Sequence, residues 1–157
     1  MYRIPIYQVK LVRDGSLTTE RKRIEGPATA ASVLHQYFEG ADREHFVVLL
    51  LDTKHQIIGI HTVSVGVLDA SLIHPREIFK PAILANAAAI ILAHNHPSGD
   101  PTPSAEDRLV TQQMVAAGRL IGIAVMDHVI VGERPHFISF VESGMLDSST
   151  RLAGIAA

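Results

Sequence analysis

Two histidines stand one residue apart in the stretch AHNHPSGDPTPSAEDR, which covers residues 93–108. In an extended segment alternate side chains face the same side, so His94 and His96 could reach one ion while Asn95 points away. Zinc binds imidazole nitrogen and carboxylate oxygen and prefers four ligands. The pair therefore needs a third protein ligand, with the fourth position left to water, and the stretch is a candidate zinc site.

The third ligand could come from the start of the following helix. Asp107 falls in the first turn of a helix expected over residues 104–118, and the intervening loop PSGDPTP is stiff and turns sharply. The alternative is a plain helix cap, because a serine followed three residues later by an acid is an N-terminal capping pattern. Taken alone, Ser104 and Asp107 fit the cap better, and His-x-His by itself is a weak signal.

A catalytic zinc also needs a carboxylate that takes a proton from water and passes it on. Glu44 is the leading candidate, because it stands at the entry to a strand expected to be buried. Glu25, Glu39 and Glu77 compete with it, and spacing alone does not choose among the four. The simpler interpretation of Glu44 is a solvated residue at a strand entry.

The elements that must position these residues are strands and helices in alternation. Apolar spacing and turn residues predict strands over residues 2–12 (at a sheet edge), 45–52, 57–65, 89–93, 120–132 and 136–140, and helices over 27–40, 74–89 and 104–118. Pro81 is expected to kink or break the second helix. This order predicts one mixed sheet covered by helices, an α/β fold.

Composition places limits on function. The chain has 157 residues, 47% of them apolar and 19% charged, which predicts one globular domain over residues 1–146 with a flexible tail at 147–157. The net charge of −2 gives no global signature of nucleic-acid binding, and residues 1–25 hold only six basic side chains against three acidic ones. The absence of cysteine excludes disulfides, thiol nucleophiles and thiolate zinc sites. No signal peptide or membrane-spanning run is visible, so we expect a cytoplasmic protein without membrane contact.

At this point the motifs resemble a known family. His94-x-His96, seven residues, Ser104, two residues and Asp107 match the JAMM motif of JAB/MPN metalloproteases. The stretches LDASLIHPREIFK, AIILAHNHPSGDPTPSAEDRLVTQQMVAAGRLIGI and MDHVIVG closely resemble the RadC family, over about residues 28–146. The resemblance implies the JAB fold, a three-layer α/β/α sandwich around a mixed sheet that is related to cytidine deaminases.

The resemblance also implies a set of roles. One zinc ion would be bound by His94, His96 and Asp107, Glu44 would be the catalytic glutamate, and Ser104 would help stabilise the oxyanion formed during amide hydrolysis. The implied activity is that of a zinc-dependent peptidase or isopeptidase acting on a peptide or protein of unknown identity.

Two other functions stay open beside the hydrolase. One is a DNA repair-associated protein or metal-dependent nuclease, although the adjacent letters HNH do not match the dispersed residues of HNH nucleases. RadC proteins usually carry an N-terminal helix-hairpin-helix-like region, and we expect a standalone domain without it, which weakens a DNA role. The other is a non-enzymatic binding module, against which the intact motif argues.

Several further polar residues have structural interpretations. Asp127 and His128 could orient a ligand imidazole from behind, but satisfying buried backbone groups is the favoured role. The stretch from His74 to Glu77 is expected to be a helix entry, and Asp69 to be structural. The remaining histidines are expected at the surface or in incidental positions: His35, His45, His55, His61 and His136.

Overall fold

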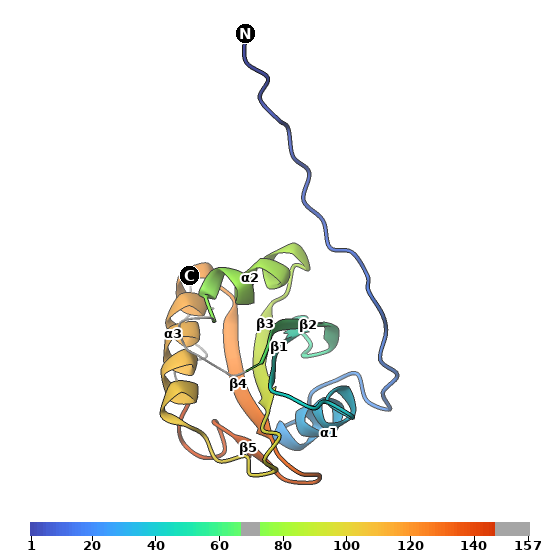
Figure 1. Ribbon diagram of the computed structural model, residues 1–157, viewed down its shortest axis with the longest axis vertical. Coiled ribbons are helices and arrows are strands. Elements are labelled where there is room, and N and C mark those ends of the chain that lie inside the picture. The colour runs from blue at the N-terminus through green and yellow to red at the C-terminus, as the bar shows by residue number, and fades with distance from the viewer. Residues whose placement is uncertain (67–72, 147–157) are drawn as a thin grey trace.

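The computed structural model of the protein describes residues 1–66 and 73–146 (Figure 1). The predicted flexible tail at 147–157 and the structural role predicted for Asp69 lie outside the described residues. Within the described part, no helix is both long and apolar enough to cross a membrane.

One mixed sheet of five strands forms the centre of the protein. Its strands follow the order β2-β1-β3-β4-β5, and β3 and β4 are parallel while every other neighbouring pair is antiparallel. The strands are β1 (His45–Leu51), β2 (Ile57–Val65), β3 (Ala89–Asn95), β4 (Ala124–Val131) and β5 (Phe137–Ser139). The strands predicted over 45–52, 57–65, 89–93 and 136–140 are confirmed, and β3 runs two residues further than predicted, so that it includes His94. The strand predicted over 120–132 starts only at Ala124, because the preceding helix passes its predicted end at 118 and continues to Ile121, where the left-handed Gly122 (φ 85°) ends it.

Three helices cover the two faces of this sheet: α1 (Pro27–Tyr37), α2 (Pro75–Leu84) and α3 (Ala105–Ile121). On β1, Val47 and Leu49 pack with α1, whereas Val48 and Leu50 pack with α2 and α3. Alternate residues of a strand face opposite sides of a sheet, so the unbroken apolar run of β1 serves two cores at once. Figure 1 shows α1 on one side of the strands and α3 on the other. The α/β class and the three layers predicted from the sequence are confirmed.

The loop between β3 and α3 lies against the end of β4. His96 N donates to Val131 O at 2.9 Å, and Glu133 N donates to Gly99 O at 2.8 Å. Gly99 has a φ of 90°, which favours glycine. Gly132 allows the close approach, because a Cβ there would collide with the backbone of Gly99. The loop is thereby fixed so that α3 begins beside the end of β3.

Two sequence predictions are wrong. Residues 2–12 form no strand, and residues 1–16 are exposed throughout and extend away from the body (Figure 1). In the described chain, one bridge lies outside the named strands, and it joins Arg23 to Gln56, beyond the end of the arm. Residues 2–12 therefore have no strand beside them to pair with, although their pattern is of the β type.

The helix predicted over residues 74–89 also differs. Pro81 lies inside α2 and does not break it, because the helix continues and Ala85 N donates to Pro81 O at 2.9 Å. The helix ends at Leu84, just before Asn86, whose φ of 54° is left-handed and incompatible with helix. A left-handed residue after the last turn, and not the proline, therefore ends the helix.

Candidate metal centre

The two histidines stand at the carboxyl end of β3. His94 is fully buried and stacks on Phe46 of β1, with ring centroids 5.7 Å apart. His96 follows just beyond the strand end and is partly buried. Their rings are tilted by 59° to each other, with centroids 4.8 Å apart and the two Nε2 atoms 3.0 Å apart. The alternation predicted from the sequence therefore brings both imidazoles to one place.

Asn95 faces the other way, as predicted. Its Oδ1 accepts from His45 N at 2.7 Å, and its Nδ2 donates to Arg43 O at 3.0 Å. These two backbone groups lie on either side of Glu44. The amide between the two histidines therefore holds the backbone that presents the glutamate.

Glu44 and Asp107 complete the group around the histidines. Glu44 Oε1 lies 3.8 Å from His94 Nε2 and 3.6 Å from His96 Nε2. Asp107 Oδ1 lies 3.1 Å from His94 Nε2, and its Oδ2 lies 3.5 Å from His96 Nε2. Glu44, His94 and His96 offer ligand atoms within 4.8 Å of one another. We call these four residues, Glu44, His94, His96 and Asp107, the histidine cluster.

The first turn of α3 forms the predicted cap and also contributes to the cluster. Ser104 Oγ accepts from Asp107 N at 3.1 Å, and Asp107 Oδ2 accepts from Ser104 N at 2.8 Å, a complete capping box. The other oxygen, Oδ1, is buried and has no hydrogen-bond partner of acceptable geometry among the described residues. One carboxylate thus caps the helix with Oδ2 and leaves Oδ1 facing the histidines.

The backbone fixes the proton on His96. His96 Nδ1 lies 2.8 Å from Asp100 O, and a carbonyl can only accept, so Nδ1 carries the hydrogen. In the neutral ring the lone pair is then on Nε2, facing His94 Nε2. Two nitrogens 3.0 Å apart need a proton or a cation between them, and two imidazoles on one tetrahedral zinc place their nitrogens about 3.3 Å apart. The arrangement and the unpartnered Asp107 Oδ1 fit a bound metal ion.

The pKa values of His96 and Asp107 are shifted in opposite directions by the contact between them. Contact with Asp107 raises the pKa of His96, although burial opposes this. Burial alone would raise the pKa of Asp107, but the contacts with His94 and His96 outweigh it and hold that pKa well below its usual range. Asp107 is therefore a carboxylate at neutral pH, the form that binds a metal.

Behind the cluster lie residues whose role the sequence did not show. His128 Nε2 is 2.9 Å from His94 Nδ1, so the predicted backbone role of His128 is wrong. Asp127 does have that role, since it accepts from His128 N at 2.8 Å and Val141 N at 3.1 Å. Thr111 was missed, although it stands one helical turn after Asp107, and its Oγ1 lies 2.6 Å from His128 Nδ1. Burial lowers the pKa of His128 well below its usual value, so its ring is neutral.

The competing glutamates lie elsewhere. Glu25 pairs with Arg21 at 3.0 Å, and Glu77 pairs with Lys80 at 3.3 Å. Glu39 lines a separate pocket beside α1. Of the four candidates, only Glu44 contacts the histidine pair.

The other histidines divide into two groups. His74 caps α2, with Nδ1 accepting from Arg76 N at 3.1 Å, which confirms the predicted helix entry. His55 and His61 are exposed, as expected. His35 differs, because its Nε2 is buried without a hydrogen-bond partner among the described residues.

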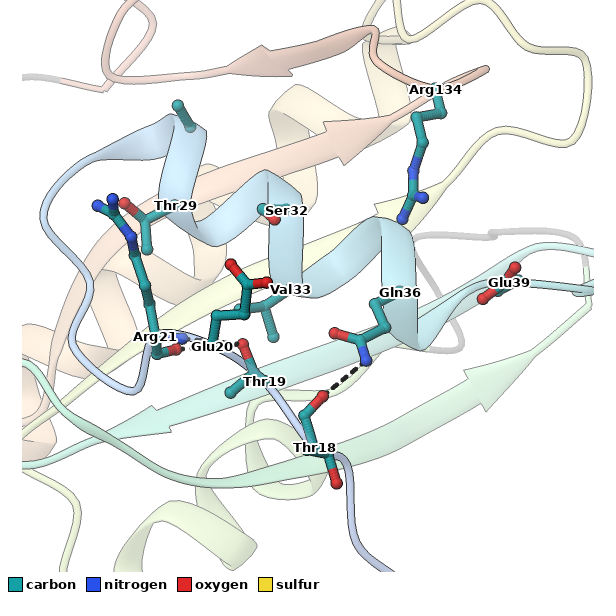
Figure 2. Close-up of a pocket in the computed structure, with 11 residues that line it drawn as sticks. Thr18, Thr19, Glu20, Arg21, Thr29, Ser32, Val33, Gln36, Glu39 and Arg134 are labelled. Atoms are coloured by element: carbon teal, nitrogen blue, oxygen red, sulfur yellow. Dashed lines mark hydrogen bonds between the residues drawn. The ribbon is translucent and has the colours of Figure 1, made fainter.

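A separate pocket of about 750 Å³ lies between residues 18–21 and α1. Figure 2 shows Gln36 of α1 donating to Thr18 O at its edge, at 2.6 Å. Its lining carries both charges, with Arg21 and Arg134 as well as Glu20 and Glu39. No member of the histidine cluster lines this pocket.

The sequence of the chain is similar to those of known proteins. The RadC-like JAB domain family matches residues 24–145. A UPF0758 protein of Rubrobacter xylanophilus is 55% identical over 126 residues, covering 80% of this chain and 55% of the relative. UPF0758 proteins of Moorella thermoacetica and Alkaliphilus oremlandii are 50% and 48% identical over 134 residues, covering 85% and 84% of this chain and 58% of each relative.

The chain thus spans little more than half the length of these relatives. The match includes every member of the histidine cluster, the whole sheet and all three helices. The chain therefore belongs to the RadC-like JAB domain family.

Proposed function

We propose that the protein is a zinc-dependent hydrolase of the JAMM type that cleaves an amide bond in a peptide or isopeptide. The observation that carries the proposal is the meeting of three ligand atoms, one of which, Asp107 Oδ1, is buried without a hydrogen-bond partner among the described residues. They are the Nε2 atoms of His94 and His96, 3.0 Å apart, and Asp107 Oδ1, 3.1 Å from His94 Nε2. Two imidazoles and one carboxylate are a ligand set of catalytic zinc sites.

Burial and distance separate the ligand from the base. The Asp107 side chain is 1% exposed and touches His94 closely, whereas the Glu44 side chain is 20% exposed and stands further from both histidines. A ligand gains from exclusion of water, while a residue that exchanges protons with water and substrate must reach them. We therefore assign Asp107 as the third ligand and Glu44 as the general base.

The bound metal would polarise the scissile carbonyl and lower the pKa of a water molecule. Glu44 would accept the proton of the attacking water and deliver it to the leaving amine nitrogen. Ser104 Oγ accepts from Asp107 N with a lone pair, so its hydroxyl hydrogen stays available to donate to the oxygen that becomes negative. The histidines and Asp107 hold the metal, and Glu44 alone moves protons.

The test measures zinc per chain by elemental analysis, for the parent protein and for His96→Ala and Asp107→Asn. We expect near-stoichiometric zinc in the parent and loss in both variants, with His61→Ala, an exposed histidine, as the matched control that keeps its zinc. A peptide and isopeptide library then reports hydrolysis by the loaded parent. If the parent cannot be loaded with zinc, Ser104 and Asp107 revert to a helix cap and the proposal fails.

A further inference from the structure

A chain of three hydrogen bonds runs behind His94. His94 Nδ1 lies 2.9 Å from His128 Nε2, His128 Nδ1 lies 2.6 Å from Thr111 Oγ1, and Thr111 Oγ1 donates to Asp107 O at 2.6 Å. All four residues are at most 2% exposed. The chain starts at one member of the histidine cluster and ends on the backbone of another.

The last acceptor sets the direction of the whole chain. A carbonyl can only accept, and two oxygens 2.6 Å apart need a hydrogen between them, so the Thr111 hydroxyl hydrogen points at Asp107 O. Thr111 Oγ1 then has only lone pairs to offer His128. His128 Nδ1 must therefore carry a hydrogen and donate it to Thr111.

The state of His94 follows from that of His128. The His128 ring lies between the Phe46 and Phe140 rings, with centroids 5.6 and 4.7 Å away, an apolar enclosure that favours the neutral ring. With its hydrogen on Nδ1, a neutral His128 offers a lone pair at Nε2. His94 Nδ1 must then be the donor, which leaves the lone pair of His94 on Nε2, the atom that faces His96 and Asp107.

We propose that Thr111 and His128 are positioning residues that hold His94 in the tautomer whose Nε2 can bind a metal. The inference rests on the proposed function, because the role of the lone pair on His94 Nε2 is to bind the metal. The two positioning residues come from different elements of the fold. Thr111 lies one helical turn after Asp107 on α3. His128 lies on β4 opposite Leu92 of β3, and Leu92 is two residues before His94 and on the same face of the sheet.

Removing only the Thr111 hydroxyl would exchange the donor and the acceptor in the hydrogen bond between His128 and His94. In Thr111→Val the His128 Nδ1 hydrogen would have no acceptor, and a buried donor without an acceptor is costly. His128 would instead carry its hydrogen on Nε2 and donate to His94 Nδ1. His94 would then carry its own hydrogen on Nε2, where Asp107 Oδ1 lies 3.1 Å away. This tautomer cannot bind a metal through Nε2.

The test reads the tautomer directly. Long-range ¹H–¹⁵N NMR of the metal-free protein, at a pH where His96 is protonated and donates from its Nε2 to His94 Nε2, reports which nitrogen of His94 carries the hydrogen. We expect hydrogen on Nδ1 in the parent and in Thr111→Ser, which keeps the hydroxyl, and on Nε2 in Thr111→Val. Thr29→Val, the same substitution on α1, is the matched control and leaves His94 unchanged. Thr111→Ala replaces the valine variant if that variant does not fold.

A chelator-competition measurement of zinc affinity is the second readout. Loss of an outer hydrogen-bond partner weakens metal binding by about 10- to 100-fold, so we expect that loss for Thr111→Val and near-parent affinity for Thr111→Ser. An unchanged His94 tautomer in Thr111→Val overturns the inference. If the parent binds no zinc but the tautomer changes as expected, the proposed function fails while the positioning role stands.

Discussion

Glu44 and Asp107 show how two carboxylates near the same histidines take different roles. Both oxygens of Asp107 are committed, Oδ2 to the helix cap and Oδ1 to the histidines, while Glu44 reaches the cluster from the start of β1. In the sequence, a helix cap and a metal ligand are alternative interpretations of Asp107. In the structure the two roles are compatible, because each uses a different oxygen of that side chain. The cap fixes the carboxylate plane, and this fixed plane sets the position of Oδ1.

Glu44→Gln separates proton transfer from metal binding. The amide keeps the size of the side chain but cannot accept a proton from water, so we expect unchanged zinc content and hydrolysis reduced by about 10²- to 10⁴-fold. Zinc analysis and single-turnover hydrolysis of a library-selected peptide measure the two effects. Glu39→Gln, on a glutamate beside α1, is the control. Loss of zinc in Glu44→Gln would instead make Glu44 a ligand.

His35 predicts a pH dependence of stability that is independent of the metal. Burial lowers its pKa, with a smaller contribution in the same direction from the Arg134 charge and an opposing one from the backbone at Pro135. Its folded pKa lies below the unfolded value of about 6.5, so the unfolded chain binds more protons as the pH falls. Stability contributed by neutral His35 is complete above pH about 6.5 and is lost as the pH falls from there towards the folded pKa.

The measurement is the unfolding free energy between pH 7.5 and 5, compared between the parent and His35→Gln. We expect the variant to lose less stability on acidification than the parent does, since glutamine does not titrate. His61→Gln, on an exposed histidine, controls for the substitution itself. Parallel curves for the parent and His35→Gln would show that His35 does not contribute to acid sensitivity.

At the scale of elements, the end of β3 connects the histidine pair with Glu44. Its last residues alternate between the two faces, so His94 contributes to the cluster while Asn95 bonds the backbone on either side of Glu44. Glu44 and the two histidines thus meet at one strand end, although they are about fifty residues apart in sequence. Displacement of β1 relative to β3 would separate them.

Asn95→Leu tests this connection. The apolar side chain leaves Arg43 O and His45 N without their partner, which costs about 1–3 kcal/mol of unfolding free energy. We also expect weaker hydrolysis at unchanged zinc content, because Glu44 loses its fixed backbone. Denaturant unfolding and zinc analysis measure these effects, with the exposed Gln112→Leu on α3 as control. Full stability in Asn95→Leu would contradict the clamping role.

At the scale of the molecule, the apolar side chains form two large cores on opposite faces of one sheet and a smaller third cluster of Ile130, Phe140 and Leu146. The arm of residues 1–16 contributes to none of them. Large apolar side chains such as Tyr2, Ile4 and Ile6 are exposed on this arm. The fold therefore does not depend on the arm.

Removal of residues 1–16 should change the unfolding free energy by no more than about 0.5 kcal/mol, as surface changes do. Ile24→Ala is the positive control, because Ile24 is 7% exposed in the core beneath α1 and its truncation should cost about 2–5 kcal/mol. Denaturant melts at two protein concentrations measure both. A large, concentration-dependent loss on removal of the arm would show that it packs on a second copy of the chain.

Much of the fold was predictable because its signals are local. The apolar run of β1, the apolar end of β3 and the helical spacing after Ser104 each indicate their element without knowledge of the rest. The strand predicted over residues 2–12 was wrong because alternation shows that a segment suits a sheet and does not supply a neighbouring strand. The end of α2 was wrong because the left-handed Asn86, and not Pro81, stops that helix.

By itself the sequence determined the family and the α/β class, and it indicated a histidine pair with an acid as the candidate site. Only the tertiary structure decided which glutamate faces the pair, that Asp107 both caps α3 and turns an oxygen to His94, and that His128 lies behind His94. The physical reason is the range of each interaction. Residue type and spacing fix what lies within a turn or a strand, whereas the parallel packing of β3 and β4 brings together groups 34 residues apart.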